Sequence, residues 1–457
     1  MPNEDVSLEK YRSTVIYSSL YSTLFRLAAP LILLELVNVS YSIVDAYWLS
    51  IWGGTSFAVP RLIRPTYMLF EAVFIALGAA NLAIMSQYIG GRRFEEASKT
   101  FHQFLTISIL LGSSLTIVYL VANDYMLKYV VRVPLELVDE AFGYSSVIAF
   151  DILLSGVSTS LTTAFNAIGE TKIPAAAGIA SALLNFFLDP LLIVGIWRIP
   201  ALGSVGAALA TVISRALKLV VLVALFSRRF SSIELKLTKN IERRWVHTTV
   251  KAGGPMFIRH SLNSFGIMVQ YSIVNSFGVI ATASYTIGFL FMDIAEAFVR
   301  GSTTPIAVIV GQNIGANNFS RARSAATRSS ILLGGVTALV SIILLLFREN
   351  LVKVFTSDPS IIFESMKFLE IFLPTLPFLT IFFIGLAIGR GSGHTLAPTA
   401  ITLVRMWGFR IICAYATSLV LGMGTSGLWL SISLGNIVGG IATTIWINIG
   451  RWCKPVI

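Results

Sequence analysis

Cysteine and histidine are scarce in this chain of 457 residues. Its two cysteines, Cys413 and Cys453, cannot build a disulfide framework, and its four histidines are scattered along the sequence. Neither residue type shows the close ligand spacing that zinc and haem sites use. The sequence therefore offers no candidate for a metal centre of that kind.

Charged residues are also few. They make up 12% of the chain, whereas hydrophobic residues make up 55%, and a soluble globular protein carries about 25% charged residues. The apolar runs last about twenty residues or more, which is the length a helix needs to cross a bilayer. Strands of a membrane barrel would alternate apolar and polar residues over roughly ten positions. We therefore expect an all-α polytopic membrane protein, because each spanning helix satisfies its own backbone hydrogen bonds.

Several motifs that would indicate other classes of protein are missing. The first residues, MPNEDVSLEKYRST, are polar and include acids, so we expect no cleavable signal peptide. There is no Gly-x-x-x-x-Gly-Lys-Ser/Thr element of an ATP-driven pump and no nucleophile–base pair, so we expect no enzyme. The net charge of +11 fits cytoplasmic loops rich in Lys and Arg, and we expect no nucleic-acid partner.

Polar breaks divide the sequence into about twelve spans in two halves. The largest break, SRRFSSIELKLTKNIERRW (227–245), is basic, as are two loops on the same side. By the positive-inside rule, both termini and this linker face the cytoplasm of a multi-pass plasma-membrane protein. We expect a cytoplasmic N-terminal segment (1–23), an N-terminal six-helix lobe (24–227), a cytoplasmic linker (228–246), a C-terminal six-helix lobe (247–450) and a tail (451–457).

The two halves form an internal repeat. MSQYIGGRRFEEA (85–97) aligns with VGQNIGANNFSRA (310–322) at a shift of 225 residues, and IGETKIP (168–174) aligns with SGHTLAP (392–398) at a shift of 224. An ordered series of matches at a nearly constant shift indicates duplication. Since each repeat has an even number of spans, the lobes are parallel repeats related by a pseudo-two-fold axis, and such pairs commonly bind substrate between them. Pairs matched at a shift of 225 include Pro30 and Pro255, Glu71 and Glu296, Gln87 and Gln312, and Gly90 and Gly315.

An ordered set of motifs carries a resemblance to one known family. They are the Gln-x-x-Gly elements at 87–91 and 312–316, FNAIGETKIP (165–174), LLNFFLDPLL (183–192), SVGAALATVIS (204–214), and a first helix with Pro30 and, well down it, Asp45. In these features the chain resembles the multidrug and toxic compound extrusion (MATE) family, within the superfamily of multidrug, oligosaccharidyl-lipid and polysaccharide flippases. The resemblance covers nearly the whole chain, and it is strongest to the prokaryotic DinF-like branch.

This resemblance implies twelve transmembrane helices in two lobes around a V-shaped central cavity. It also implies a secondary transporter that couples inward flow of H⁺ or Na⁺ to export of bulky, often cationic, organic drugs, uses no cofactor, and bends its first helix at Pro30. Other branches place a coupling acid in the seventh helix, but here that helix has no Asp or Glu and carries Gln270 at the place equivalent to Asp45. The coupling acids are therefore expected in the N-terminal lobe.

Asp45 and Asp189 are the leading candidates for cation coupling. Ionisable residues within spans are costly and usually face a cavity or a partner. Both acids fall in the outer halves of spans that run in the same direction, so they reach a similar depth. Tyr41 lies four residues before Asp45 and Asn185 lies four residues before Asp189, so each shares a helical face with its acid.

The chemistry of such a pair allows two coupling ions. Two close carboxylates in a low dielectric cannot easily both ionise, so the pair is suited to hold a proton at neutral pH. Carboxylate, amide and phenol oxygens are also suitable hard ligands for Na⁺, and the sequence leaves the two ions open. We assign five further polar residues to the substrate cavity or its support: Tyr144, Asn166, Asp151, Thr211 and Gln270.

The C-terminal lobe carries its own charges. Arg405 and Arg410 lie mid-span in the eleventh helix, and we expect them to pair with Glu296, Asp293 or backbone carbonyls. Otherwise they would line a site for an anionic substrate. Because Glu71 and Glu296 occupy equivalent places in both repeats, an architectural role is favoured over coupling for these two residues.

The leading hypothesis is an H⁺- or Na⁺-coupled multidrug exporter. One chain already contains both lobes, so we expect a monomer, with small organic drugs and membrane lipids as its partners. A flippase for lipid-linked oligosaccharide or polysaccharide shares the broad fold, and it would need basic residues in the cavity to bind pyrophosphate. Arg259, Arg405 and Arg410 are the candidates for that role. A non-transporting membrane enzyme or receptor is the third alternative.

Overall fold

The structure, a computed structural model, describes residues 5–52, 58–131, 133–195, 200–230 and 233–457, which are helical without strands. Parts of the predicted N-terminal segment (1–4), N-terminal lobe (53–57, 132 and 196–199) and linker (231–232) lie outside the described residues. The helices of the first half are α1 (Asp5–Tyr17), α2 (Leu20–Trp52), α3 (Ala58–Gly90), α4 (Phe94–Tyr125), α5 (Val138–Ile168), α6 (Lys172–Pro190) and α7 (Gly203–Arg229).

The second half repeats this order with more irregular helices. Its α-helices are α8 (Arg243–Asn275), α9 (Val279–Gly315), α10 (Phe319–Lys353), α11 (Pro359–Phe372), α12 (Leu376–Ser392), α13 (Leu396–Leu403) and α14 (Thr425–Ile449). A 3₁₀ turn, η4 (Leu373–Thr375), joins α11 to α12, and two π-helical segments, η5 (Val404–Cys413) and η6 (Ala416–Val420), extend α13. In the first half, π-helices η1 (Met126–Val131) and η3 (Leu191–Gly195) extend α4 and α6, and η2 (Leu135–Leu137) precedes α5.

Eleven helical segments of the described chain are long and apolar enough to cross a membrane. The twelfth long helix, α8, is more polar because it begins in the basic linker, at Arg243 and Arg244, and carries Lys251 further along. It packs against α3. The predicted all-α fold with twelve long helices is confirmed. The short helix α1 stands outside this set, and its low hydrophobicity gave no reason to expect a span there.

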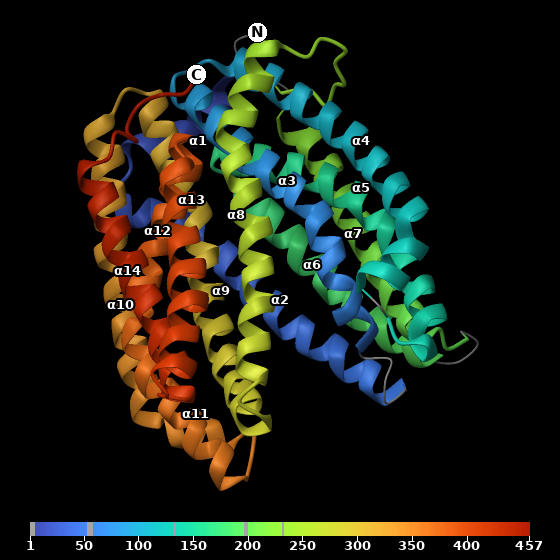
Figure 1. Cartoon of the computed structure of the whole chain (residues 1–457). Helices are drawn as coiled ribbons and strands as arrows, with labels where there is room; N and C mark the ends of the chain where they lie inside the picture. The colour runs from blue at the N-terminus through green and yellow to red at the C-terminus, as the bar shows by residue number, and fades with distance from the viewer. Residues whose placement is uncertain (1–4, 53–57, 132, 196–199, 231–232) are drawn as a thin grey trace.

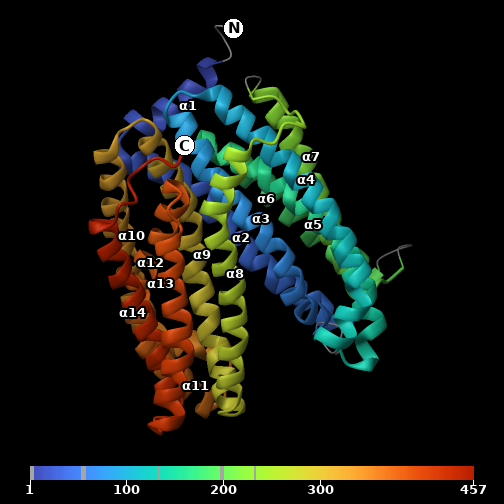
Figure 2. The same ribbon diagram turned by 45° about the horizontal axis from the view of Figure 1, so that its top comes forward.

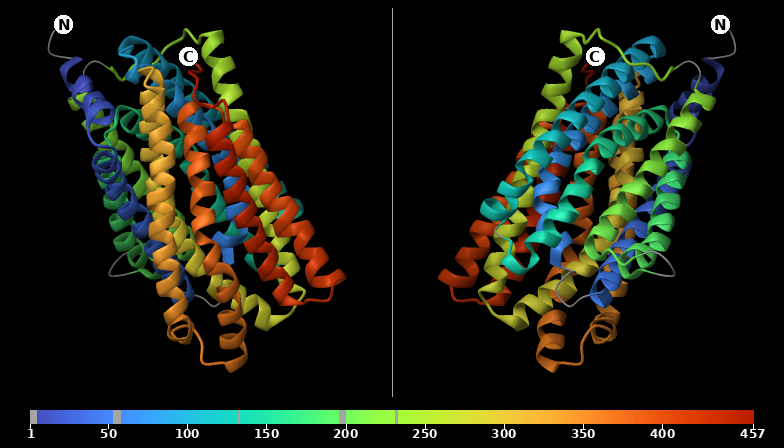
Figure 3. Two further views of the ribbon diagram at one scale, coloured as in Figure 1. Left: turned by 90° about the vertical axis from the view of Figure 1, so that its left-hand side faces the viewer. Right: turned by 90° about the vertical axis from the view of Figure 1, so that its right-hand side faces the viewer.

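The long helices form two bundles, which we call the N-terminal lobe (α2–α7) and the C-terminal lobe (α8–α14). The lobes pack together at the end where both chain termini lie, and they splay apart towards the opposite end (Figure 1, Figure 2). The connection from α7 to α8 crosses the same end as the termini (Figure 3). The lobes meet where α2 packs on α9 and where α3 packs on α8 and α9.

Small side chains let α3 approach its neighbours closely. Gly78, Ala79, Ala80 and Ala83 are buried in its second half, and a Cβ added to Gly253 of α8 would lie 2.8 Å from the carbonyl oxygen of Ala76. Helices in a membrane gain little from the hydrophobic effect against one another, so close backbone packing through small residues holds them together. This explains why α3 forms the junction between the lobes.

The two repeated glutamines close the end that holds the termini. Gln87 Nε2 donates to the carbonyl oxygens of Gly391 and Ser392, 3.3 and 3.1 Å away, and Gln312 Nε2 donates to those of Ala167 and Ile168, 2.7 and 3.2 Å away. Each glutamine thus binds a helix end of the opposite lobe, where Gly169 and Gly393 adopt φ of +98° and +79°. These helix ends carry the matched IGETKIP and SGHTLAP motifs, so the repeat encodes a symmetric closure.

The repeated glycines bring the two backbones into direct contact at this closure. A Cβ added to Gly90 would lie 1.9 Å from the carbonyl oxygen of Gln312, and a Cβ added to Gly315 would lie 1.9 Å from that of Gln87. No side chain fits at such distances, so both positions require glycine. We call the four residues Gln87, Gly90, Gln312 and Gly315 the closed gate.

Helix α1 and the C-terminal tail add contacts across the closed gate. Arg12 Nε donates to the carbonyl oxygen of Gly90 at 2.8 Å, and Arg321 of α10 donates to the carbonyl oxygens of Val15 and Ser18. Helix α1 is therefore tied to both lobes. The backbone N–H of Val456 donates to Gln87 Oε1 at 2.9 Å.

Candidate functional site

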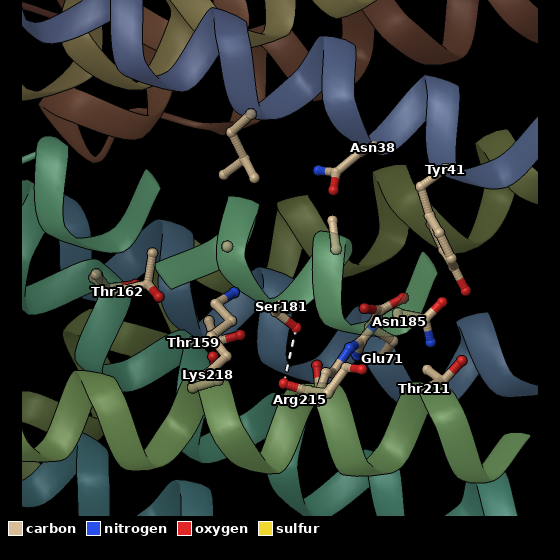
Figure 4. A pocket seen from close by; sticks show the side chains of 17 residues that line it. Asn38, Tyr41, Glu71, Thr159, Thr162, Ser181, Asn185, Thr211, Arg215 and Lys218 are labelled. Carbon is tan, nitrogen blue, oxygen red and sulfur yellow. Dashed lines mark hydrogen bonds between the residues drawn. The ribbon is translucent and has the colours of Figure 1, made fainter. Parts of the chain in front are cut away.

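The N-terminal lobe brings the two predicted coupling acids together. Asp45 on α2 and Asp189 on α6 are close enough to interact electrostatically. Tyr41 interacts with both carboxylates and is hydrogen-bonded to Thr211 of α7. We call Tyr41, Asp45, Asn185, Asp189 and Thr211 the acid pocket. A cavity of about 340 Å³ borders it, lined by Tyr41, Asn185 and Thr211 (Figure 4).

Asp189 and Asn185 are buried without protein partners. Asp189 is 0% exposed and Asn185 is 3% exposed, and neither the two carboxylate oxygens nor the amide atoms have a hydrogen-bond partner within the described residues. Buried polar groups in native proteins are nearly always paired, and an isolated carboxylate is costly to bury unless it is neutralised or binds a cation. The oxygens of this pair therefore suit a proton or a small cation as the missing partner.

The helix carrying Asp189 changes geometry directly after it. Pro190 has no N–H group and frees a backbone carbonyl one turn earlier, and α6 ends there, to be continued by the π-helix η3. π-helical segments are rare and occur frequently at functional sites, so this irregularity places Asp189 at a local break in the regular hydrogen bonding.

Asp151 has a partner that the sequence analysis missed. Its carboxylate forms an ion pair with Arg215 Nη1 at 2.6 Å and accepts a hydrogen bond from the Tyr67 hydroxyl, also at 2.6 Å. It lines, with Tyr144 and Asp45, a second cavity of about 390 Å³ beside the acid pocket. Because Arg215 neutralises it, Asp151 supports the pocket and is not one of the unpaired acids.

The basic residues of α7 also face these cavities. Thr211, Arg215 and Lys218 lie four and three residues apart, so they share one helical face, and Figure 4 shows them along α7 beside the pocket. The signal was present in SVGAALATVISRALKL (204–219), because Arg215 and Lys218 are charges within a predicted span. The N-terminal lobe therefore holds basic groups close to its acids.

The matched pair Glu71 and Glu296 has different surroundings in the two lobes. Glu71 lines both cavities of the N-terminal lobe. Glu296 pairs with Arg300 at 3.2 Å, and the same Arg300 pairs with Glu35 of α2 at 3.2 Å. Helix α2 is thus linked to the C-terminal lobe through Glu35, ten residues before Asp45.

A larger cavity of about 950 Å³ lies between the lobes. Asn166 lines it, as predicted for a supporting residue, whereas Gln270 is buried beside it and does not line it. The acids in its wall are Asp293 and Glu296. Its wall also contains seven arginines: Arg61, Arg64, Arg259, Arg300, Arg390, Arg405 and Arg410.

Arg405 forms no direct ion pair among the described residues, although the expected partner Glu296 lies within electrostatic reach of it. Its Nε and Nη2 atoms donate to Asn436 Oδ1 of α14, at 3.2 and 2.9 Å, and its guanidinium lies 4.7 Å from the ring centre of Phe382. Asn436 is 31 positions away in the sequence, and only the packing of η5 on α14 brings the two together. Arg410 also forms none of the ion pairs found among the described residues, since Glu296 is taken by Arg300.

Pro30 lies within the continuous helix α2. The Thr171 hydroxyl donates to the carbonyl oxygen of Leu27, one turn before this proline, at 2.9 Å. The matched Thr395 hydroxyl donates in the same way to Ala252, which precedes Pro255. The two hydroxyls therefore bind α2 and α8 at equivalent places, in the turn before Pro30 and Pro255.

Curated relatives match this chain over most of its length. The "probable multidrug resistance protein YoeA" of Bacillus subtilis is 23% identical and the alignment covers 90% of each chain. The "probable multidrug resistance protein NorM" of Thermotoga maritima is 24% identical over 95% of this chain and 93% of the relative. The "FAD transporter" of Shewanella oneidensis is 23% identical over 98% of each.

Solved structures show the same fold. A crystal structure of MATE in the straight conformation has a TM-score of 0.88 at 21% identity, covering 95% of this chain and 97% of that one. An outward-facing multidrug resistance MATE transporter has a TM-score of 0.86 at 21% identity, with the same coverage. The MatE family model matches the chain twice, at residues 30–191 and 255–416, one match within each predicted lobe. The chain therefore belongs to the MatE family of multidrug and toxic compound extrusion transporters.

Proposed function

We propose that this protein is a secondary active exporter of organic compounds in the plasma membrane, driven by H⁺ or Na⁺ that binds in the N-terminal lobe. The observation that carries the proposal is the buried, unpartnered Asp189 with Asn185 beside it and Asp45 within electrostatic reach. The relatives named as multidrug resistance proteins support an organic substrate, and the relative named as an FAD transporter extends that class to an anionic nucleotide. The exporter works as a monomer surrounded by membrane lipids.

With both termini in the cytoplasm, the lobes of this structure splay towards the outside and the closed gate seals the cytoplasmic end. A cation entering from outside binds at Asp45 and Asp189 and neutralises them. Tyr41, Asp45 and Glu35 are all on α2, so a changed charge in the acid pocket acts on the same helix that pairs with Arg300 of the C-terminal lobe. Movement of α2, with Pro30 as its bending point, then displaces the substrate and allows the lobes to rock.

A flux assay in proteoliposomes tests this proposal. A pH gradient and a Na⁺ gradient are imposed separately, with ethidium and FAD as probes. We expect one gradient to drive flux of at least one probe, and Asp45→Asn to abolish that flux. Asp124→Asn is the matched control, since Asp124 is an exposed acid of α4 paired with Lys128 at 2.7 Å. Full gradient-driven flux in Asp45→Asn, or no gradient-driven flux of either probe in the wild type, would contradict the proposal.

One observation favours a second function. Seven arginines line the cavity between the lobes, and a flippase for lipid-linked oligosaccharide or polysaccharide needs basic groups for its pyrophosphate. The distinguishing experiment is movement of a polyprenyl pyrophosphate lipid between leaflets of the same liposomes. Lipid movement without gradient-driven flux of ethidium or FAD would favour the flippase over the exporter.

A further inference from the structure

The cavity between the lobes has an excess of positive charge. Seven arginines line it against two acids, Asp293 and Glu296. Glu296 is already paired with Arg300, so it neutralises none of the other arginines by direct contact. A cavity with this composition repels organic cations and attracts anions. This differs from the cationic substrates that the family resemblance implied.

Two of these arginines are aligned by an irregular helix. Arg405 and Arg410 lie five residues apart on η5, and the backbone hydrogen bonds of a π-helix join residues five apart, so the two side chains stand on successive turns of one face. In an α-helix, five residues would turn them well away from each other. Gly439 of α14 provides the room, because a Cβ there would lie 3.1 Å from Arg405 Cδ.

Both guanidinium groups are buried, and although Glu296 lies within electrostatic reach of both, neither forms a direct ion pair among the described residues. Arg405 is 4% exposed and Arg410 is 3% exposed, and the ion pairs found among the described residues include neither of them, nor Arg259, nor Arg390. Arg410 Nε and Nη2 and Arg259 Nε have no hydrogen-bond partner within the described residues. Buried charges in proteins are normally paired, because removing a charge from water is costly.

A purely structural role explains only some of these side chains. Arg405 is held by Asn436 and Phe382, and Arg390 Nη2 donates to the Thr303 hydroxyl at 2.6 Å. These contacts fix the position of the side chains, while Glu296 acts on Arg405 and Glu35 acts on Arg390 without a direct ion pair. Arg410, which is 3% exposed, interacts with Tyr285, but its Nε and Nη2 atoms have no hydrogen-bond partner within the described residues. An anionic ligand supplies both the missing charge and the missing acceptors.

The wall of the cavity also has an apolar part. Met256, Met268, Met292, Phe289 and Phe383 line the same cavity. Methionine adapts to irregular shapes and makes favourable contacts with aromatic rings. A volume of about 950 Å³ is at the upper end of the range for small-molecule sites. The cavity therefore has room for a large flat or hydrophobic body next to its basic wall.

We propose that the cavity binds an amphipathic organic anion whose phosphate or pyrophosphate group contacts Arg405 and Arg410, while its aromatic or hydrocarbon body lies against the methionines and phenylalanines. Arginine forks match phosphate oxygens in pairs, and several neighbouring arginines favour a group with more than one negative charge. The inference rests on the proposed export function and names its substrate class. A soluble nucleotide and a lipid headgroup share this chemistry.

Flavins test the phosphate requirement, because riboflavin, FMN and FAD share one ring and differ in phosphate. Their equilibrium binding to the purified protein in detergent is followed by flavin fluorescence, with ethidium as the cationic probe. We expect FMN or FAD to bind at least about tenfold more tightly than riboflavin or ethidium. In Arg405→Gln/Arg410→Gln that preference is lost and riboflavin binding is unchanged. Arg348→Gln is the control, since Arg348 is a basic residue outside the cavity, paired with Glu370 at 2.8 Å.

Competition with farnesyl pyrophosphate separates the two sources of the phosphate. Displacement of FMN or FAD by farnesyl pyrophosphate supports a site shared with lipid headgroups, and tighter binding of FAD than of farnesyl pyrophosphate supports a soluble nucleotide. If the double variant does not fold, the wild-type comparison of FMN with riboflavin and of farnesyl pyrophosphate with farnesol decides the matter. Equal affinities within both pairs, or tighter binding of ethidium than of every phosphate compound, would overturn the inference. Equilibrium binding needs no gradient, so this result is independent of whether Asp45 couples transport.

Discussion

The two lobes descend from one repeat, yet their buried acids and arginines are distributed differently. The N-terminal lobe places Asp45 and Asp189 in its acid pocket, and at the shifts of 225 and 224 residues the corresponding positions hold Gln270 and Cys413. Conversely, Arg405 of the C-terminal lobe corresponds to Ser181 at the shift of 224. The C-terminal lobe therefore has no acid at the two positions that correspond to Asp45 and Asp189.

The closed gate shows no such divergence. Gln87 and Gln312 bind equivalent helix ends in the opposite lobe, and Gly90 and Gly315 make equally close backbone contacts. The duplicated sequence is thus retained where both lobes must meet, and it differs where each lobe has its own pocket. In our proposals, cation binding belongs to the N-terminal lobe and phosphate binding to the C-terminal wall of the central cavity.

The symmetry of the closed gate predicts equal effects from its two glycines, and these are the largest effects expected. Gly90→Val and Gly315→Val each place side-chain atoms where a Cβ alone would be 1.9 Å from a carbonyl oxygen. We expect both variants to lose transport by at least about tenfold, because the closed end cannot form. Flux in proteoliposomes measures this.

Gly254→Val in α8 is the matched control for these glycines, because a Cβ there meets nothing within 4 Å. The control should transport like the wild type. A large loss in Gly90→Val with normal transport in Gly315→Val would show that the gate is functionally one-sided, against the symmetry that the contacts indicate.

The second comparison concerns ion pairs, one buried and one exposed. In the N-terminal lobe, Arg215 neutralises the buried Asp151. Arg215→Met leaves a carboxylate that is 1% exposed without its ion-pair partner, and we expect a loss of roughly 3 kcal/mol in stability. Thermal unfolding in detergent measures the change as a fall in Tm. Adding Asp151→Asn should recover much of the loss, since it removes the unpaired charge.

The matched change for Arg215 is Arg348→Met in the C-terminal lobe. Its pair with Glu370 is exposed, so the expected loss is below about 1 kcal/mol. Equal falls in Tm for Arg215→Met and Arg348→Met would show that the buried ion pair contributes no more to stability than the exposed one.

The smallest expected effect concerns the contacts of α1 with the N-terminal lobe outside the membrane. A hydrogen bond from Arg92 lowers the pKa of Glu9 below its usual value, with Arg12 adding to the effect. The pKa of Glu9 is lower in the folded protein than in the unfolded chain. The ionised side chain therefore stabilises the folded state at pH values above the unfolded pKa of about 4.3. The contribution is lost as pH falls through the lowered folded value.

Glu9 is partly exposed, so the stabilisation is at most about 0.5 kcal/mol. The difference in Tm between the wild type and Glu9→Gln should therefore be small at pH 7 and should vanish at the acid end of the titration. A difference that grows as pH falls would have the wrong sign for this ion pair.

The sequence was sufficient for features that lie along one helix. Apolar runs long enough to span a membrane predicted the helices, and the constant shift between motifs predicted the two repeats that the family model also matches. Asp45 and Asp189 were predicted as a pair because charge within a span and helical spacing are both visible in one dimension. The structure brings them within electrostatic reach.

Contacts between helices were harder to predict. The pairing of Asp151 with Arg215 joins α5 to α7, and that of Arg405 with Asn436 joins η5 to α14. Both depend on how neighbouring helices rotate, which apolar periodicity does not specify. The π-helical geometry of η5 was also outside the reach of sequence patterns, because packing against α14 decides it. Arg61 and Arg64 could have been identified, since each is a charge inside a predicted span.

Relocating the acid between lobes tests the central claim most directly. Gradient-driven flux is measured in liposomes for the wild type, for Asp45→Asn, and for Asp45→Asn combined with Gln270→Asp, which places a carboxylate at the equivalent position of the other lobe. If coupling resides in the acid pocket, flux is lost in Asp45→Asn and is not restored by Gln270→Asp, because Asp189 and Asn185 have no counterparts there. Flux that persists in Asp45→Asn, or that returns with Gln270→Asp, would contradict the account.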